Sequence, residues 1–249
     1  MKRIYLLFVS LMVAITLQAK PFTLVIDAGH GGKDPGAVGK KLKEKDINLR
    51  VALALGKLVE QNMPDAKVVY TRKTDVFVEL NQRANIANRN KADLFISIHT
   101  NASGVNRSVK GTETYTLGMH RAASNLEVAK RENSAIMMEN DYEEKYEGFD
   151  PKSSESYIIF ELMQDQYMKQ SVDLAGNIQR QFSSTAGRRD RGVYQAGFLV
   201  LRATSMPSVL VELGYITTQE EENYLATNKS TEELSRSLFN AIKQYRNGK

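Results

Sequence analysis

The amino-acid sequence predicts an α/β fold in which a mainly parallel or mixed central sheet is flanked by helices and carries a helical insertion. Short apolar runs of strand length alternate with longer segments whose apolar residues recur at helical spacing. This alternation resumes near the C-terminal end, which is typical of a sheet built from repeated strand and helix units. Residues 119–182 differ, because they show helical periodicity without a strand-like run.

The N-terminal half supplies most of the expected sheet. Residues 22–27 are largely apolar and predict a strand, and the glycine-rich stretch 28–36 after them predicts a sharp turn. Residues 45–61 carry a broad apolar stripe at helical spacing, which predicts a well-buried helix. The other elements expected here are strands at 66–70 and 93–98 and a helix at 78–90.

The C-terminal part predicts one more strand and two helices. Residues 208–211 are apolar and β-branched, as in a buried strand. Two capping boxes, Thr218 with Glu221 and Ser230 with Glu233, are expected to begin the helices that follow.

The insertion is expected to contain two helices. One spans residues 120–140, and the other has its apolar face between Met168 and Phe182. An acidic, turn-like stretch at 139–151 separates them.

The first residues have the pattern of a secretory signal. Two basic residues precede an apolar run that is short for a membrane span, and a small residue, Ala19, comes before a polar break. We therefore expect a signal peptide at 1–19, cleaved after Ala19, with an uncleaved anchor as the alternative. The catalytic domain is expected at 20–249, exported to the periplasm or cell envelope. No cysteine follows the apolar run, which excludes a lipoprotein anchor.

Charge and cysteine content narrow the function classes. The chain has no cysteine, so disulfides and cysteine-type structural zinc sites are excluded. Its formal net charge is +5, and loss of Lys2 and Arg3 with the signal would leave +3. That mild positive balance suits either contact with anionic polymers or an ordinary solvated surface. We expect no nucleic-acid partner and a monomer.

Two of the three histidines follow predicted strands, His30 after the first and His99 after the third. Ligands of open α/β sheets bind outside the carboxyl ends of the strands, so the two imidazoles are expected to meet there. Glu44 begins the helix that lies between them in the sequence. Taken singly, each residue is as well explained by a structural role, and Glu44 by the helix dipole. Together they form the ligand set of a catalytic zinc ion, which leaves one position to water.

Glu212 is the remaining candidate of the core. It directly follows three apolar strand residues, where a carboxylate without a partner is costly to bury. Either it binds the metal or it moves protons beside it. Because His30, Glu44 and His99 already give three ligands, Glu212 is interpreted as general base and acid.

The motifs that contain these residues resemble those of a known family, the zinc-dependent N-acetylmuramoyl-L-alanine amidases of bacterial cell separation. They cover the α/β core in order: 26–37 (IDAGHGGKDPGA), 44–49 (EKDINL), 71–75 (TRKTD) leading to Leu80 and Arg83, 87–88 (AN), 92–102 (ADLFISIHTNA) and 207–215 (PSVLVELGY). Thr100 stands where the family often has alanine, and Tyr215 where it often has phenylalanine. Neither departure removes a ligand.

The resemblance implies one zinc ion held by His30, Glu44 and His99, with Glu212 as the catalytic carboxylate. It also implies a peptidoglycan substrate, the amide that joins N-acetylmuramic acid to L-alanine of the stem peptide. A zinc-bound water would attack that amide while Glu212 transfers the protons. Two alternatives stay open: a zinc peptidase that cuts within the stem peptide, and an inactive wall-binding or amidase-activating module.

The insertion also resembles part of the family. Residues 131–136 are similar to the segment that lies across the active site and caps the metal in regulated members. Our hypothesis is that a helix from about His120 to Asn140 blocks the site, with Glu132 as the first candidate for the blocking ligand and Glu139 as the second. An activator protein that binds the opened helix would then restore activity. A solvated helical decoration is the alternative.

Overall fold

The computed structural model describes residues 20–104, 106–161 and 166–248. The expected signal peptide at 1–19 lies outside the described residues. Within the described ranges, no helix combines the length and the apolar character that crossing a membrane requires.

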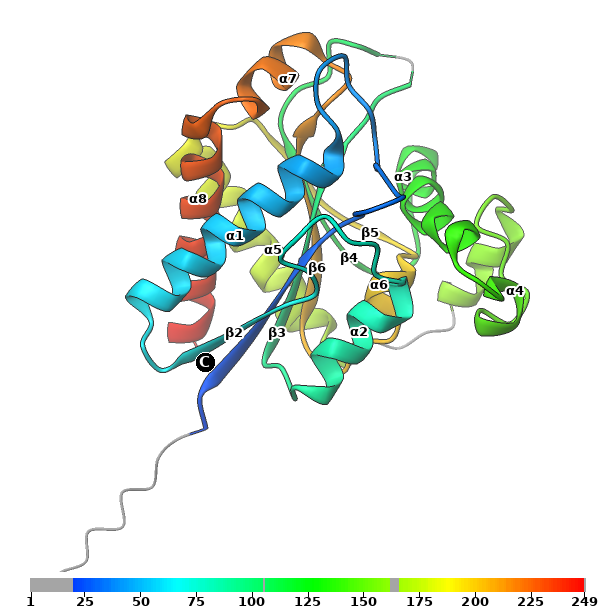
Figure 1. The fold of residues 1–249 in the computed structure, drawn as a ribbon, viewed down its shortest axis with the longest axis horizontal. Coiled ribbons are helices and arrows are strands. Elements are labelled where there is room, and N and C mark those ends of the chain that lie inside the picture. The colour runs from blue at the N-terminus through cyan, green and yellow to red at the C-terminus, as the bar shows by residue number, and fades with distance from the viewer. Residues whose placement is uncertain (1–19, 105, 162–165, 249) are drawn as a thin grey trace, which may run out of the picture.

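A six-stranded mixed sheet forms the centre of the fold (Figure 1). Its order is β2-β1-β3-β6-β4-β5, and all neighbouring strands pair in parallel except β4 and β6, which are antiparallel. The predicted fold class is therefore confirmed. The strands are β1 (Phe22–Ala28), β2 (Ala66–Tyr70), β3 (Leu94–Asn101), β4 (Thr112–Leu117), β5 (Asp190–Ala196) and β6 (Ser208–Tyr215).

Two of these strands, β4 and β5, have no counterpart among the expected elements. All six residues of β4 are buried, yet four of them are threonine or glutamate. A strand whose buried side chains are polar gives no apolar run, so hydrophobic patterning does not reveal it.

Helices cover both faces of the sheet (Figure 1). Leu24 and Ile26 of β1 pack into one core together with residues of α1 (Glu44–Asn62), α5 (Met168–Ala186) and α8 (Asn228–Asn247). Val25, between them in sequence, packs into the opposite core, because successive side chains of a strand point to opposite faces. That second core is closed by α2 (Leu80–Arg89), α6 (Leu199–Arg202) and the insertion.

The two expected capping boxes are wrong in detail. Thr218 does precede α7 (Gln219–Leu225), but its hydroxyl donates to the carbonyl of Val109 and caps no helix N–H. Helix α8 begins earlier than expected, after Thr227, whose hydroxyl accepts from the backbone N–H of Ser230. Ser230 therefore lies inside the first turn of the helix.

The insertion is built from short helical segments at one side of the sheet (Figure 1). They are α3 (Ala123–Asn133), η1 (Ser134–Met138), α4 (Tyr142–Lys145) and η2 (Glu155–Glu161). The expected continuous helix over 120–140 is therefore interrupted at Ser134 by a tighter 3₁₀ segment. Helix α5, expected to belong to the insertion, packs instead against α8 and β4, with Leu174, Ile178 and Phe182 fully buried in the core.

A buried ion pair anchors the strand that leads to the first histidine. Asp27 on β1 is fully buried, and it accepts hydrogen bonds from Arg83 Nη1 at 2.8 Å and from the hydroxyls of Thr71 and Ser97, each at 2.6 Å. Arg83 also donates to the carbonyl of His30 at 2.9 Å. Burial by itself would raise the pKa of Asp27, but Arg83 and the two hydroxyls hold it below its usual value.

Replacement of Asp27 by asparagine is expected to destabilise the fold strongly, since it leaves the buried Arg83 charge without a counter-ion. The expected loss is about 3–5 kcal/mol in the free energy of unfolding, measured by denaturant titration near neutral pH. Because the folded pKa is depressed, the loss should shrink as the pH falls below about 4, where Asp27 of the unfolded parent takes up a proton while that of the folded parent is still ionised. Asp65→Asn, which removes an exposed partner of Arg246, is the control and should change little. Equal stability of the Asp27 variant and the parent would contradict this account.

Candidate metal centre

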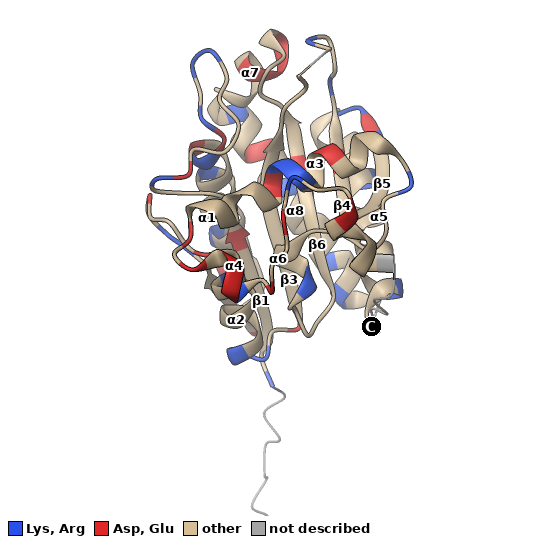
Figure 2. Cartoon of the chain, turned by 90° about the vertical axis from the view of Figure 1, so that its right-hand side faces the viewer, with Lys and Arg blue, Asp and Glu red and all other residues tan. Residues whose placement is uncertain are grey.

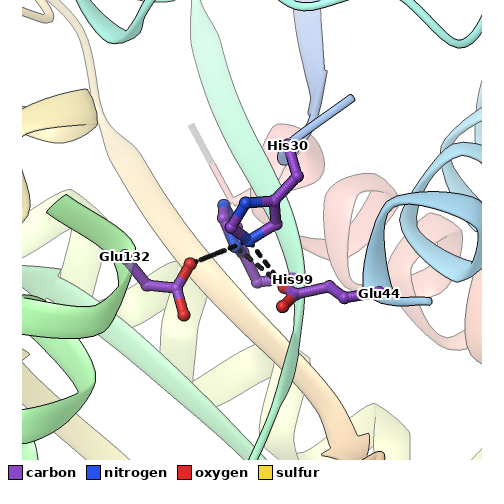
Figure 3. Close-up of side chains that lie close together, drawn as sticks. All are labelled: His30, Glu44, His99 and Glu132. Carbon is purple, nitrogen blue, oxygen red and sulfur yellow. Dashed lines mark hydrogen bonds and ion pairs between the residues drawn. The ribbon is translucent and has the colours of Figure 1, made fainter. Parts of the chain in front are cut away.

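Four side chains from distant parts of the sequence converge on one buried point (Figure 3). His30 comes from the loop after β1, Glu44 from the first residue of α1, His99 from β3 and Glu132 from α3. Their ligand atoms all lie within 4.8 Å of one another. Three of the four are the predicted metal ligands, and the fourth is the first candidate for the blocking ligand.

The two imidazoles and the two carboxylates alternate around this point. Glu44 Oε1 lies 3.1 Å from His30 Nε2 and 3.1 Å from His99 Nδ1. Glu132 Oε2 lies 3.0 Å from the same atom of His30 and 2.9 Å from the same atom of His99. The two carboxylates thus approach the imidazole pair from opposite sides (Figure 3).

The chain conformation at the first histidine depends on glycine. A Cβ at Gly29 would lie 2.4 Å from the ring nitrogen Nε2 of His99, so only glycine lets the two histidines come together. Gly36 closes the other side, where a Cβ would lie 2.7 Å from Glu44 Oε2. The glycine-rich loop is therefore needed for close approach at the site.

Neighbouring groups fix the orientation of the ligands. Asp34 Oδ2 lies 2.8 Å from His30 Nδ1, which leaves Nε2 to face the centre. Carboxylate partners of this kind commonly orient metal-bound histidines. Glu44 accepts from the backbone N–H of Thr100 through Oε1 and from that of Ala37 through Oε2, each at 2.8 Å. Asp34 was not among the predicted site residues, although it lies within the same glycine-rich motif.

The donor set fits a zinc ion. Two imidazole nitrogens and carboxylate oxygens are ligands that zinc prefers in tetrahedral sites. Buried His30 Nε2 and Glu132 Oε2 form no hydrogen bond with any described residue, as expected for atoms that face a cation. Burial opposes protonation of His99, yet Glu132 and Glu44 raise its pKa to about 9, so the carboxylates create a field that favours positive charge at this point.

Glu212 lies beside the four residues and is not one of them. It is paired in register with His99 across β3 and β6, and its side chain is buried. Burial and the nearby Glu132 raise the pKa of Glu212 well above its usual range. Arg131 Nη2 lies 3.4 Å from Glu212 Oε1. The strand-end placement predicted for Glu212 thus puts its carboxyl next to the imidazole cluster.

Glu139, the second candidate for the blocking ligand, lies elsewhere. Its carboxylate accepts from the backbone N–H of Leu80 at 2.9 Å and from the hydroxyl of Tyr146 at 3.0 Å. It therefore joins the insertion to the start of α2 and does not reach the metal centre.

Comparison with known proteins places this geometry in a family. Residues 24–244 match the family described as N-acetylmuramoyl-L-alanine amidase. The chain is 33% identical over 232 residues to N-acetylmuramoyl-L-alanine amidase AmiC of Escherichia coli, a match that covers 91% of this chain and 53% of that protein. It is 32% identical to AmiA of Escherichia coli, over 89% of this chain and 75% of the relative.

Solved structures show the same fold. The catalytic domain of CwlV, an amidase of Bacillus (Paenibacillus) polymyxa, has a TM-score of 0.66 and 32% identity over 91% of this chain and 99% of its own. An N-acetylmuramoyl-L-alanine amidase of Clostridium difficile has a TM-score of 0.69 and 27% identity, covering 93% of this chain and 100% of its own. The site geometry, the family match and the relatives together establish that this chain belongs to the N-acetylmuramoyl-L-alanine amidase family.

Proposed function

We propose that the protein is a zinc-dependent amidase that cleaves the bond between N-acetylmuramic acid and L-alanine of the peptidoglycan stem peptide. The observation that carries the proposal is the convergence of His30, Glu44 and His99 beside Glu212 in a chain of this family. Mass analysis of the products from purified wall fragments tests it. Release of peptides that begin with L-alanine would support the amidase, whereas cuts within the peptide would identify a zinc peptidase instead.

The mechanism assigns a separate task to each group. His30, Glu44 and His99 would hold the zinc ion. When bound, the ion would lower the pKa of its water to about 7 and polarise the amide carbonyl. Glu212 takes the proton of the attacking water and passes one to the departing amine, which leaves poorly unless protonated. Burial, and after it the nearby Glu132, raises the pKa of Glu212 well above its usual range, which suits a carboxyl that must take up a proton as well as release one.

We also propose that α3 holds the enzyme in a closed state. Glu132 would act as a further ligand in place of the attacking water, since its Oε2 lies within 3.0 Å of a nitrogen of each imidazole. Arg131 on the same helix contacts Glu212 at the same time. Figure 2 shows α3, with basic residues in blue, crossing in front of β6 and β4.

A buried asparagine fastens this helix to the core. Asn133 at the end of α3 donates to the carbonyl of Gly197 at 2.7 Å and accepts from the backbone N–H of Leu199 at 2.9 Å. Opening of the site therefore requires these hydrogen bonds to break together with the contacts of Glu132.

Replacement of Glu132 by alanine is expected to raise basal hydrolysis of purified wall, because it frees the position that water must occupy. If the open state of the parent is populated to 10% or less, the increase should be about tenfold or more. Asn133→Ala should act in the same direction. Glu143→Ala is the control, since Glu143 is an exposed residue of α4 in the same insertion and does not line the site. Variants that remain folded and zinc-loaded but are no faster than the parent would rule out autoinhibition.

The same proposal includes a partner and a location. Exposed apolar side chains lie on the insertion, including Met137, Met138, Ile158 and Ile159. Such a surface suits an activator protein that binds the insertion and draws α3 away. The signal pattern at 1–19 supports export to the periplasm or cell envelope. There the protein is proposed to act on peptidoglycan during cell separation, as a monomer.

A further inference from the structure

A row of polar residues crosses the sheet and continues beyond the metal centre. His99 on β3 is in register with Glu212 on β6, and Glu212 is directly opposite Glu113 on β4. Residues directly opposite in neighbouring strands point to the same face of the sheet. Arg191 on β5 extends the row, since its Nε lies 2.8 Å from Glu113 Oε1. Four adjacent strands thus lead from a metal ligand, through the proposed general base, to an arginine.

Glu113 fixes the side chains at the far end of this row. Its Oε1 accepts from the hydroxyl of Tyr215 at 2.6 Å as well as from Arg191. Its Oε2 accepts from the hydroxyl of Tyr115 at 2.7 Å and from Asn101 Nδ2 at 3.1 Å. Four donors satisfy a buried carboxylate, so Glu113 serves to position these groups. The cluster is prearranged, and its arginine is held in one orientation.

These side chains line a cavity of about 450 Å³. One wall is formed by the sheet, with Glu113, Tyr215 and Arg191, and the other by α3, including Arg131. Because Arg131 also contacts Glu212, the cavity lies next to the proposed general base. The side chain of Arg191 is 28% exposed, so its guanidinium is accessible from the cavity. The volume suits a ligand of a few residues.

The chemistry of the reaction determines which part of the substrate lies there. In the proposed function, on which this inference rests, Glu212 gives its proton to the amine of the departing peptide. The peptide must therefore lie on the side of Glu212, where the row continues toward Arg191. The acyl side of the amide, whose carbonyl faces the metal, lies toward His30 and Glu44.

We propose that the sheet wall of this cavity, which does not include α3, binds the stem peptide when the site is open, and that Arg191 receives a carboxylate of the residue that follows L-alanine. Guanidinium and carboxylate groups form paired, charge-assisted hydrogen bonds of defined orientation. The rings of Tyr115, Tyr194 and Tyr215 border the same cavity and would pack against the aliphatic part of the peptide. Arg191 is thus a specificity-determining residue that acts on the leaving peptide.

A pair of muropeptides tests the proposal. They differ only in carrying a free carboxylate or a carboxamide on the residue after L-alanine. The quantity measured is the ratio of kcat/KM for the two substrates on each zinc-loaded protein. Because both substrates meet the same protein, the fraction of open molecules cancels from this ratio. The parent should prefer the carboxylate by about tenfold or more, as expected for hydrogen bonds to a charged group.

Arg191→Gln should bring the ratio close to one, chiefly through loss on the carboxylate substrate, while the zinc content stays as in the parent. Arg189→Gln is the matched control, since Arg189 is an exposed neighbour that does not line the cavity, and it should keep the ratio of the parent. Arg191→Lys should give an intermediate ratio. It replaces Arg191→Gln as the test variant if Arg191→Gln does not fold.

Two negative results have different meanings. Cleavage at the L-alanine amide with the same ratio in the parent and in the Arg191 variants would overturn this subsite and leave the proposed function standing. A parent protein that prefers the carboxamide would likewise overturn the subsite and leave the proposed function standing. If the parent cleaves the L-alanine amide of neither muropeptide, the proposed function fails and the subsite fails with it.

Discussion

Removal of the bound metal is expected to abolish hydrolysis of peptidoglycan, and added zinc is expected to restore it. Two imidazoles and a carboxylate converge on one point, and without the cation nothing there would lower the pKa of the attacking water or polarise the amide carbonyl, which Glu212 alone cannot do. His30→Ala and His99→Ala should each bind little zinc, because each removes one of three protein ligands. Metal content by elemental analysis and product release by mass spectrometry, measured on the same preparations, test the expectation.

The third histidine offers the matched control. His120 is outside the group of converging residues, so His120→Ala should keep both zinc and activity. A thoroughly demetallated preparation with full activity would show that the metal has no part in the reaction.

Glu212→Gln is expected to keep its zinc while kcat falls by about two to four orders of magnitude, the usual contribution of general acid–base catalysis. Glutamine has nearly the same shape but cannot take up the proton of water. Glu44→Gln should instead weaken zinc binding, since Glu44 Oε1 lies 3.1 Å from each of the two histidine nitrogens.

The comparison is best made in proteins that also carry Glu132→Ala. Arg131 contacts Glu212 in the closed state, so loss of that contact alone could change the fraction of open molecules. Loss of zinc from the Glu212 variant, together with retention of zinc by the Glu44 variant, would show that the two roles are reversed.

The sequence by itself determined the class of fold and most of the metal centre. Apolar strands that alternate with amphipathic helices must pair in a sheet, and parallel strands bring their carboxyl ends to one edge. His30 and His99 were therefore expected at the same edge of the sheet, and the pairing of β1 with β3 brings them together. The structure places His30 Nε2 and His99 Nδ1 each 3.1 Å from one oxygen of Glu44.

Which of the two candidate blocking carboxylates lies at the candidate metal centre was decided only by the tertiary structure. Glu132 and Glu139 are seven residues apart, so a continuous α-helix would present both on one face. The 3₁₀ segment Ser134–Met138 changes the periodicity, and Glu139 turns toward Leu80 while Glu132 stays at the centre. That break follows from the packing of the insertion against the core and not from a local signal.

The polar row toward Arg191 likewise came only from the tertiary structure. Strands β4 and β5 contain too few apolar residues for hydrophobic patterning to reveal them, and Glu113 and Arg191 are 78 residues apart in the sequence. Burial of Glu113 is tolerated because four donors, one from each of β3, β4, β5 and β6, surround its carboxylate. This compensation exists only after the strands have assembled, since three of the four donors lie on strands other than that of Glu113.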